Sequence, residues 1–597
     1  MKRQNHRGKL GAMAGDPTAT AIDIAAADGP DAGVNGPGDP DEWDVIDWRA
    51  QEARVRRLRQ RTFKAAQAGD LKQVRNLQKL MLRSRANTLV SVRQVSQRNT
   101  GHRTPGVDGQ VALTSLARAG LAEFLHRQGG PGRALPVRRV YVPKKGGERP
   151  LGIPSIADRA QQARVRNALE PEWEARLDPR QYGFRPGRGC HDAIEAIWNA
   201  VRLARANRVW ILDADLKAAF DRLDHNFLLD RIGMFPAREQ IREWLKAGVV
   251  DRGRYAPTSE GTPQGGVISP LLLNIVMQGM EEAAGARYDK NCHAMPGTPA
   301  VITYADDFVA LCHSREQAEA VWGKLSTWLE PRGLSFNQDK TQIAHLEQGF
   351  DFLSFNIRRY HTKDGVKVLV KPSKDALKKI RRRLRQELRD LRGATTEAVI
   401  RRLNPIIRGQ AGYYRTGVSV KAYAALDHHL WRHLYTWGLH RHRSKGRKWV
   451  TARYFGTFNK ARNDKWVFGD RATGAYLHKY AWTKIVRHVV VTGRASPDDP
   501  ALTQYWADRR RKQPAPQLAE SWHKALRAQA GTCPLCGGQL LATRPDSAIQ
   551  AEIWYAALRS TLTFQASPDH NHGRTTNRLV HSHCVHRHPD DAPATAS

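Results

Sequence analysis

The sequence predicts a multidomain α+β protein, and three observations lead to this prediction. The chain has 597 residues, which is more than one hydrophobic core normally organises. Within residues 43–370, a helical start is followed by short apolar runs that alternate with helical patterns, as expected for mixed strands and helices. The character then changes, first to basic amphipathic helices and finally to a small module that contains cysteine and histidine.

The charge of the chain indicates a polyanionic partner. It contains 96 Lys and Arg against 58 Asp and Glu, a formal net charge of +38. Binding to a polyanion would release counterions and depend strongly on salt. No stretch approaches 18 uninterrupted apolar residues, and the first residues lack an apolar secretory core, so no membrane span is expected. Six cysteines with one closely spaced pair do not make a disulfide framework, and we expect a reducing cytoplasm.

Composition and turn-forming residues predict the organisation of the first part of the chain. Residues 1–42 are rich in Ala, Gly, Asp and Pro and are expected to form a disordered leader. A helical pattern begins at Trp43. Residues 99–109 are rich in turn-forming residues and read as a loop before the alternating region that extends to residue 370.

An acidic hairpin is the strongest chemical signal. Tyr304–Asp307 lies between two apolar runs, which predicts a tight turn between two short strands. Adjacent carboxylates at such a tip repel each other, and a pair of divalent cations would remove that cost. Asp215 follows the apolar run Val209–Leu212 and supplies a third carboxylate for a site whose two ions lie roughly 3.5–4 Å apart. The alternative is a solvated Asp-Asp turn.

A series of further motifs surrounds these carboxylates. They are Val142–Lys145, Arg149–Pro154, Tyr182–Arg188, Asp213–Asp221, Gly261–Gly266, Ser269–Leu272, Gly333–Asn337 with Lys340, and Phe352–Phe355. Together with Tyr304–Asp307, and in this order, they resemble the reverse transcriptases encoded by group II introns. The resemblance implies right-hand polymerase fingers and palm over residues 43–370.

In the resembled family, Asp215, Asp306 and Asp307 are the catalytic residues and the ligands of two Mg²⁺ ions. Hard carboxylate oxygens suit Mg²⁺, which is completed by water and substrate phosphates. Strand alternation places Asp213 on the same face as Asp215, so spacing alone does not separate the two. The family pattern selects Asp215.

The resemblance also implies a nucleotide-binding set. Its members are Lys144, Arg149, Phe220, Gln264 and Lys340. Lys144 and Arg149 would hold the incoming triphosphate. Phe220 matches the residue that blocks a ribose 2′-hydroxyl, with an ordinary core phenylalanine as the alternative. Gln264 lies beside glycines that let a backbone approach the nucleotide closely, and Lys340 would assist the pyrophosphate side unless it is a plain surface lysine.

Residues 371–460 are predicted to form a helical thumb, or maturase domain. Apolar residues recur at three- and four-residue steps from Leu377 to Leu391, with basic residues between them. A solvated bundle explains the apolar stripe but not the one-sided charge, which favours RNA contact. Arg and Tyr side chains suit phosphates and exposed bases. The candidate RNA-binding residues are Arg381, Arg382, Arg385, Arg408, Tyr413, Tyr414 and Arg415.

The remaining chain divides into two predicted parts. Residues 461–525 are basic and aromatic, and the resemblance alone makes them a DNA-binding region. Residues 526–590 are predicted to be a small zinc-binding ββα-metal (HNH) endonuclease domain. Cys533, Cys536, His581 and Cys584 give a Cys₃His set for structural Zn²⁺.

The nuclease residues follow from the HNH resemblance. His570 would activate water and Asn577 would orient the loop, whereas Asp569 with His586 or His588 would hold a second divalent metal. A purely structural zinc ribbon is the alternative. The sequence departs from the family where His581 and Val585 stand, since Cys and His are common there.

The expected function is therefore a group II intron-encoded protein that copies RNA into DNA, assists splicing and cuts target DNA. Its expected partners are intron RNA, target DNA and dNTPs, in a bacterial-type cytoplasm and at the nucleoid when it acts on DNA. A splicing-only maturase and a reverse transcriptase without an intron are the alternatives. The intact carboxylates argue against the first, and the C-terminal regions argue against the second.

Overall fold

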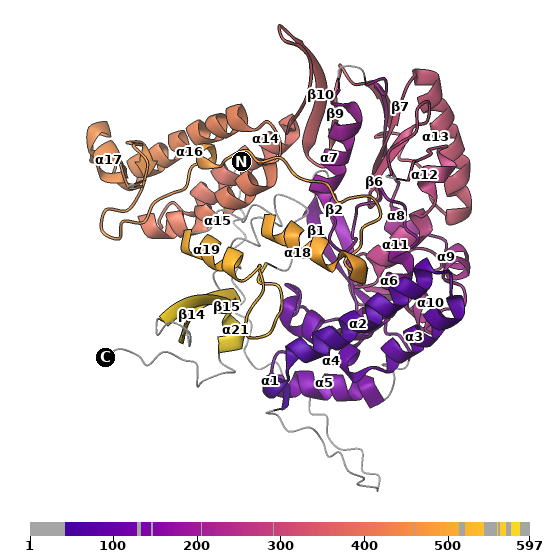
Figure 1. Cartoon of the computed structure of the whole chain (residues 1–597). Coiled ribbons are helices and arrows are strands. Elements are labelled where there is room, and N and C mark those ends of the chain that lie inside the picture. The colour runs from indigo at the N-terminus through magenta and orange to yellow at the C-terminus, as the bar shows by residue number, and fades with distance from the viewer. Residues whose placement is uncertain are drawn as a thin grey trace, which may run out of the picture.

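The computed structural model describes residues 42–127, 133–144, 147–203, 206–290, 292–459, 461–512, 520–541, 558, 561–568 and 575–585 (Figure 1). The predicted leader, apart from its last residue, lies outside this range. The predicted α+β class is confirmed, with mixed sheets and helices followed by a helical lobe. Among the described residues, no helix is both long enough and apolar enough to cross a membrane.

The N-terminal part is a layer of helices. Asp47, Asp70 and Ser84 each accept a backbone hydrogen bond in the first turn of the helix that follows, which sets where three of these helices begin. The helices are α1 (Glu42–Val45), α2 (Trp48–Gln67), α3 (Leu71–Arg83), α4 (Arg85–Arg93), the π-helical η1 (Gln94–Arg98) and α5 (Ser115–Arg127). Residues 99–109 contain turns without helix or strand, as predicted.

A four-stranded sheet in the order β2-β1-β4-β5 forms the fingers. Its strands are β1 (Val137–Lys144), β2 (Gly147–Ile153), β4 (Val249–Asp251) and β5 (Arg254–Ala256). Helix α6 (Ile156–Glu174) follows the β1–β2 hairpin in the chain and packs against the N-terminal helices, whereas α9 (His225–Ile232) packs against α10 (Arg238–Lys246) and contributes to the core beneath the palm sheet. The β1–β2 hairpin is antiparallel, with Val142 opposite Arg149.

The palm is a second four-stranded sheet in the order β6-β7-β3-β8. Its strands are β3 (Trp210–Asp215), β6 (Ala300–Tyr304), β7 (Asp307–Cys312) and β8 (Gln342–His345). The helices around it are α7 (Cys190–Val201), α8 (Ala219–Arg222), α11 (Ser269–Met277), α12 (Met280–Ala283), α13 (Arg315–Leu329) and the 3₁₀ helix η2 (Glu330–Arg332).

The two faces of the palm sheet belong to different cores. Leu212, Phe308 and Ala310 face a core that includes α11 and α13. Ile211 and Val309 face a second core, which continues without a break into the helical thumb. Because side chains alternate along a strand, the palm sheet is held between both cores.

The thumb joins the palm through a three-stranded sheet in the order β11-β10-β9. These strands are β9 (Phe350–Phe352), β10 (Phe355–Thr362) and β11 (Gly365–Pro372), and the thumb helices are α14 (Lys374–Asp390), α15 (Thr396–Tyr414), α16 (Val420–Arg441) and α17 (Arg447–Tyr454). Ile380, Leu384 and Leu388 of the predicted stripe are buried, which confirms its apolar face. Short strands β12 (Phe455–Gly456) and β13 (Val467–Phe468) and the 3₁₀ helix η3 (Tyr480–Trp482) follow.

Residues 483–512, here named the return segment, pass from the thumb back to the N-terminal helices (Figure 1). This segment contains the 3₁₀ helix η4 (Pro500–Leu502) and α18 (Thr503–Lys512). The C-terminal module then comprises α19 (Glu520–Ala528), β14 (Leu562–Pro568), β15 (Thr575–His581) and α21 (Ser582–Val585). The predicted 461–525 region therefore spreads over the thumb, the return segment and the start of this module.

Candidate active site and metal centre

The acidic hairpin forms as predicted. Tyr304 and Asp307 are cross-strand partners, so Ala305 and Asp306 make a two-residue turn between β6 and β7. Ala305 has a φ of 57°, the left-handed conformation that such tight turns require. On the neighbouring strand, Asp215 lies directly opposite Asp307. The three predicted carboxylates therefore meet at one end of the palm sheet.

Asp215 is held by the segment that precedes β8. Its backbone C=O accepts a hydrogen bond from the N–H of Asn337 at 2.8 Å. Its Oδ2 accepts hydrogen bonds from Asn337 Nδ2 at 3.3 Å and from Lys340 Nζ at 2.5 Å. The Leu216 N–H donates to the C=O of Asp306 at 3.3 Å, which ties the strand end to the hairpin tip.

Burial and the crowding of acids raise the pKa of the carboxyl groups at the hairpin tip. Burial, followed by the charges of Asp306 and Asp215, raises the pKa of Asp307 to about 8. Burial also raises the pKa of Asp306, and the nearby Arg149 and Lys340 charges oppose that rise. Burial and like charges both disfavour the ionised forms, so a bound divalent cation would be strongly favoured here. Three carboxylates at one end of the sheet fit the oxygen ligands that Mg²⁺ takes.

Asp213 shares the face of Asp215 but lies further from the tip. It pairs across the sheet with Val309, two pairs away from the Asp215–Asp307 pair, and its Oδ2 accepts a hydrogen bond from Gln342 at 3.4 Å. Burial raises the pKa of Asp213 to about 6. The register therefore favours Asp215 over Asp213 as the third carboxylate, in agreement with the resemblance.

The fingers bring a chain of polar groups toward the acids. Arg149 Nε donates to Gln264 Oε1 at 2.9 Å, and Gln264 Nε2 donates to Asp221 Oδ2 at 2.9 Å. Gly265 approaches the fingers so closely that a Cβ would lie 2.7 Å from the Gly152 carbonyl oxygen. Arg149 and Gln264, both predicted to contact the nucleotide, are thus neighbours on the fingers side of the carboxylates.

Phe220 is buried, and the centre of its ring lies 6.2 Å from the centre of the exposed ring of Phe184. Its carbonyl accepts a hydrogen bond from the Thr262 N–H at 2.5 Å. The predicted role against the ribose stays a prediction. The backbone of Lys144 ends β1, whereas its side chain lies outside the described part of the chain. Lys340 is paired with Asp215, and its predicted role on the pyrophosphate side stays a prediction.

The sequence interpretation missed the packing under the hairpin tip. A Cβ at Gly183 would lie 2.3 Å from the backbone nitrogen of Ala305. The Gly183 carbonyl accepts a hydrogen bond from Asn274 Nδ2 at 2.9 Å, and the Tyr182 N–H donates to Thr303 at 2.9 Å. The motif Tyr182–Arg188 was the available signal, because it contained a glycine beside aromatic residues.

The predicted RNA-binding residues separate into two groups. Arg381, Arg382 and Arg385 line an open hollow of about 690 Å³ between α14 and α16, together with histidines of α16. Arg408 and Arg415 are half-buried. The first group therefore presents cationic side chains to solvent, as the one-sided charge predicted.

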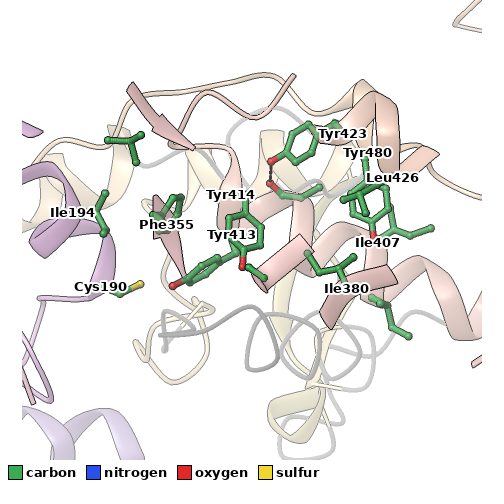
Figure 2. Packing of buried hydrophobic residues seen from close by; sticks show 14 of the residues in the cluster. Cys190, Ile194, Phe355, Ile380, Ile407, Tyr413, Tyr414, Tyr423, Leu426 and Tyr480 are labelled. Carbon is green, nitrogen blue, oxygen red and sulfur yellow. Dashed lines mark hydrogen bonds between the residues drawn. The ribbon is translucent and has the colours of Figure 1, made fainter. Parts of the chain in front are cut away.

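Tyr413 and Tyr414 require a correction. Both side chains are only 3% exposed and pack around Phe355 in the core between palm and thumb (Figure 2). Tyr413 Oη donates to the Leu353 carbonyl at 3.1 Å. The expectation that these tyrosines meet exposed RNA bases is wrong, because their position on α15 faces the interior. The helical period of 3.6 residues predicts that two consecutive residues point in different directions from the helix axis. Both tyrosines are nevertheless buried, because the core surrounds this end of α15.

The C-terminal cysteines and histidine come together as predicted. One ligand atom each from Cys533, Cys536, His581 and Cys584 lies within 4.8 Å of the others, and all four residues are buried. His581 Nε2 lies 3.1 Å from the Gln539 carbonyl, which leaves Nδ1 facing Cys536 Sγ at 3.2 Å. A carbonyl group that hydrogen-bonds one ring nitrogen of a histidine orients the imidazole so that its other nitrogen can bind a metal. The donor set fits tetrahedral Zn²⁺.

The nuclease residues are only partly described. Asn577 lies on β15 opposite Ala566, with its side chain exposed. Asp569, His570, His586 and His588 lie outside the described residues. The described elements follow the order β14, β15, α21, and the Cys₃His cluster joins the end of β15 to α21.

Comparison with known proteins identifies the polymerase and thumb regions. Residues 142–357 match the model of reverse transcriptase (RNA-dependent DNA polymerase), and residues 43–125 match the N-terminal domain of reverse transcriptase. Residues 377–455 match the group II intron, maturase-specific domain. The three matches coincide with the fingers and palm, the N-terminal helices and the thumb.

Individual relatives agree with these matches. Protein YkfC of Escherichia coli (strain K12) is 33% identical over 321 residues, which are 48% of this chain and 84% of YkfC. The group II intron-encoded protein LtrA of Lactococcus lactis subsp. cremoris is 29% identical over 284 residues, 37% of this chain and about half (47%) of LtrA. Maturase-like protein 1 of Euglena gracilis is 24% identical over 317 residues, 52% of this chain and 64% of that protein. The chain therefore belongs to the family of group II intron reverse transcriptases and maturases.

Proposed function

We propose that this protein copies RNA into DNA with two Mg²⁺ ions and assists the splicing of a group II intron RNA. The convergence of Asp215, Asp306 and Asp307 at one end of the palm sheet carries this proposal. A splicing-only maturase would have no need to keep three crowded carboxylates, whose mutual repulsion disfavours their ionised forms.

The chemistry follows from the positions of the side chains. When bound, the metal pair would activate the primer 3′-hydroxyl and neutralise the leaving pyrophosphate. The three carboxylates hold the site, and Asp215 is oriented by Asn337. Arg149 and Gln264 face the same space from the fingers and are suited to hold triphosphate and nucleotide. Phe220, packed against Phe184, supplies a rigid wall for the ribose.

The thumb supports the maturase part of the proposal. Arg381, Arg382 and Arg385 project from α14 into one hollow, where several phosphates can be neutralised at once. Intron RNA is the polyanion that the maturase-specific match suggests. Target DNA and dNTPs are the other partners of this proposed activity.

The C-terminal module carries a second candidate function, DNA cleavage. The Cys₃His cluster beside the hairpin of β14 and β15 and helix α21 supports a zinc-stabilised ββα unit. In this proposal His570 activates water, Asn577 orients the loop, and Asp569 with a later histidine binds a second metal. Cleavage of target DNA would then supply the primer for reverse transcription.

Primer extension tests the polymerase proposal. With Mg²⁺ and an RNA template, the wild-type protein is expected to extend a DNA primer. Asp306→Ala should reduce the rate by more than about a hundredfold because a metal ligand and its charge are lost. Asp213→Asn is the matched control, since it removes a neighbouring acid from the same face, and it should retain most activity.

Two results would contradict this assignment. Full extension by an Asp215→Ala, Asp306→Ala double variant would show that these residues do not hold the metals. Absence of extension by a folded wild-type protein that still binds intron RNA and promotes its splicing would favour the splicing-only maturase.

A further inference from the structure

We propose that the thumb carries a stacking site for an unpaired nucleobase of a single-stranded nucleic acid, built around Trp466 and Trp482. The site lies outside the polymerase centre and goes beyond the RNA contacts proposed for α14. An open hollow of about 650 Å³ is lined by Arg462, Asn463, Asp464, Lys465, Trp466 and Trp482. Two indoles and two cations around one hollow match the way single strands are bound, with bases on aromatic faces and phosphates on cations.

Trp466 is an exposed aromatic side chain in a fixed position. Its side chain is 53% exposed, although a tryptophan ordinarily buries most of its surface. Its backbone N–H donates to Asp464 Oδ1 at 3.0 Å. Its ring contacts Trp431 at 5.9 Å and Phe455 at 6.4 Å between centroids. A rigid exposed indole loses little conformational entropy when a base stacks on it.

The negative charge of Asp464 is compensated by Lys479, so it does not repel a phosphate group in the hollow. Its two carboxylate oxygens accept hydrogen bonds from Lys479 Nζ at 2.9 and 2.7 Å, and it also hydrogen-bonds Trp482. The guanidinium of Arg462 lies 5.4 Å from the centre of the Trp482 ring. The one acid of the hollow is therefore neutralised, and Arg462 and Lys465 remain as cations at its rim.

A series of contacting aromatic side chains connects this hollow to the basic hollow between α14 and α16. His428, which lines the basic hollow, stacks on Trp431 with centroids 6.1 Å apart, and Trp431 contacts Trp466. Tyr435 stacks on Trp431 at 5.6 Å. A short single strand can thus place phosphates among Arg381, Arg382 and Arg385 and a base at Trp466.

The ligand class follows from the chemistry of the two hollows. A base paired inside a duplex is stacked on its neighbours and offers no free face to an indole. The indoles therefore require an unpaired base, whereas the cations require the phosphates beside it. RNA and DNA share this chemistry, and the experiment separates them.

Fluorescence of 2-aminopurine tests the site, because stacking on an indole quenches it. Single-stranded RNA and DNA oligonucleotides of the same sequence, each with one central 2-aminopurine, are titrated with the full-length protein. Binding is expected to quench the fluorescence. Trp466→Leu should weaken binding roughly 5- to 150-fold, the range for loss of one base–aromatic stack, and remove most of the quenching. Trp466→Phe should retain most of the affinity and most of the quenching.

The control is Trp449→Leu, which removes another exposed tryptophan (39% exposed) on α17, outside the hollow. It should leave affinity and quenching unchanged. Lys465→Gln should reduce the salt dependence of binding while retaining the quenching at saturation. Tighter binding of one oligonucleotide identifies RNA or DNA as the ligand, and equal binding identifies single strands of either kind.

The proposal is overturned if wild-type protein binds the oligonucleotides without quenching, or if Trp466→Leu and Trp449→Leu behave alike. A duplex carrying the same 2-aminopurine and quenched equally would overturn it too. The assay needs no polymerase activity, so Asp306→Ala should give the wild-type signal. Failure of the polymerase proposal therefore remains distinguishable from failure of the stacking site.

Discussion

At the scale of single residues, the candidate active site combines close backbone packing with its three acids. Gly183 lies against the hairpin tip that carries Asp306 and Asp307, and Asn274 holds the Gly183 carbonyl. The hairpin tip has little room to move, because both its strands and the segment beneath it are hydrogen-bonded. Such positioning matters, since small displacements of metal ligands lower catalytic rates strongly.

Gly183→Ala tests this packing. Its Cβ would lie 2.3 Å from the Ala305 nitrogen, so the hairpin tip must shift. We expect a loss of about 1–3 kcal/mol in the free energy of unfolding and at least a tenfold loss in primer extension. Gly323→Ala is the control, because nothing lies within 4 Å of a Cβ there, and it should be neutral or slightly stabilising. Equal behaviour of the two variants would contradict the packing argument.

At the scale of elements, the return segment ties distant parts of the chain together. Asp192 at the start of α7 is fully buried and accepts hydrogen bonds from His488 Nε2, from the Val491 N–H and from Arg509 Nη2, each at 2.9 Å. Asp498 pairs with Arg59 of α2 at 2.6 Å. The segment is therefore part of the polymerase core as well as a candidate DNA contact.

Asp192→Asn tests this role. The change leaves Arg509 buried beside a neutral partner, and removing one member of a buried pair typically costs about 3–5 kcal/mol. Thermal unfolding should begin at lower temperature, and trypsin should cut faster within residues 483–512. The control Glu319→Gln removes a partner of the exposed pair with Arg315 and should change stability by less than about 1 kcal/mol. An unchanged protease pattern in Asp192→Asn would show that other contacts hold the segment.

At the scale of the whole molecule, the metal module is joined to the N-terminal helices by close contacts. A Cβ at Gly537 would lie 2.9 Å from the side chain of Arg49 on α2. Its own small core centres on the cysteines, Leu579 and Val580. For a core of this size we expect a bound metal to contribute much of the folding free energy. The polymerase and thumb, in contrast, share one extended core.

Removal of the metal should therefore act locally. Cys533→Ser is expected to abolish stoichiometric zinc, as measured by metal analysis, and to unfold the module, as seen by proteolysis after residue 520. Primer extension and splicing assistance should remain largely intact. Cys292→Ser, a free cysteine outside the cluster, should keep zinc. Wild-type protein without zinc would refute the ligand set, and equal DNA cleavage by wild type and His570→Ala would refute the nuclease role.

The sequence by itself, with its family resemblance, determined the candidate acidic site and the Cys₃His cluster, whose members the structure brings together. Asp215, Asp306 and Asp307 lie at strand ends, where alternation and a two-residue turn leave little freedom of placement. The cysteine spacing likewise limits the geometry of a tetrahedral metal site. Local rules of this kind fix the conformation of the hairpin tip and of the closely spaced cysteine pair, whereas the meeting of Asp215 with the hairpin was predicted from the motif order of the resembled family.

Only the tertiary structure decided which thumb residues face solvent and where the return segment lies. Tyr413 and Tyr414 fit an RNA-binding pattern, yet they are buried because β10 and α7 cover that end of α15. The contacts of Asp192 with His488 and Arg509, and the approach of Trp466 to Trp431, join residues far apart in the chain. Burial depends on what packs against a helix from elsewhere, and local periodicity carries no information about that partner.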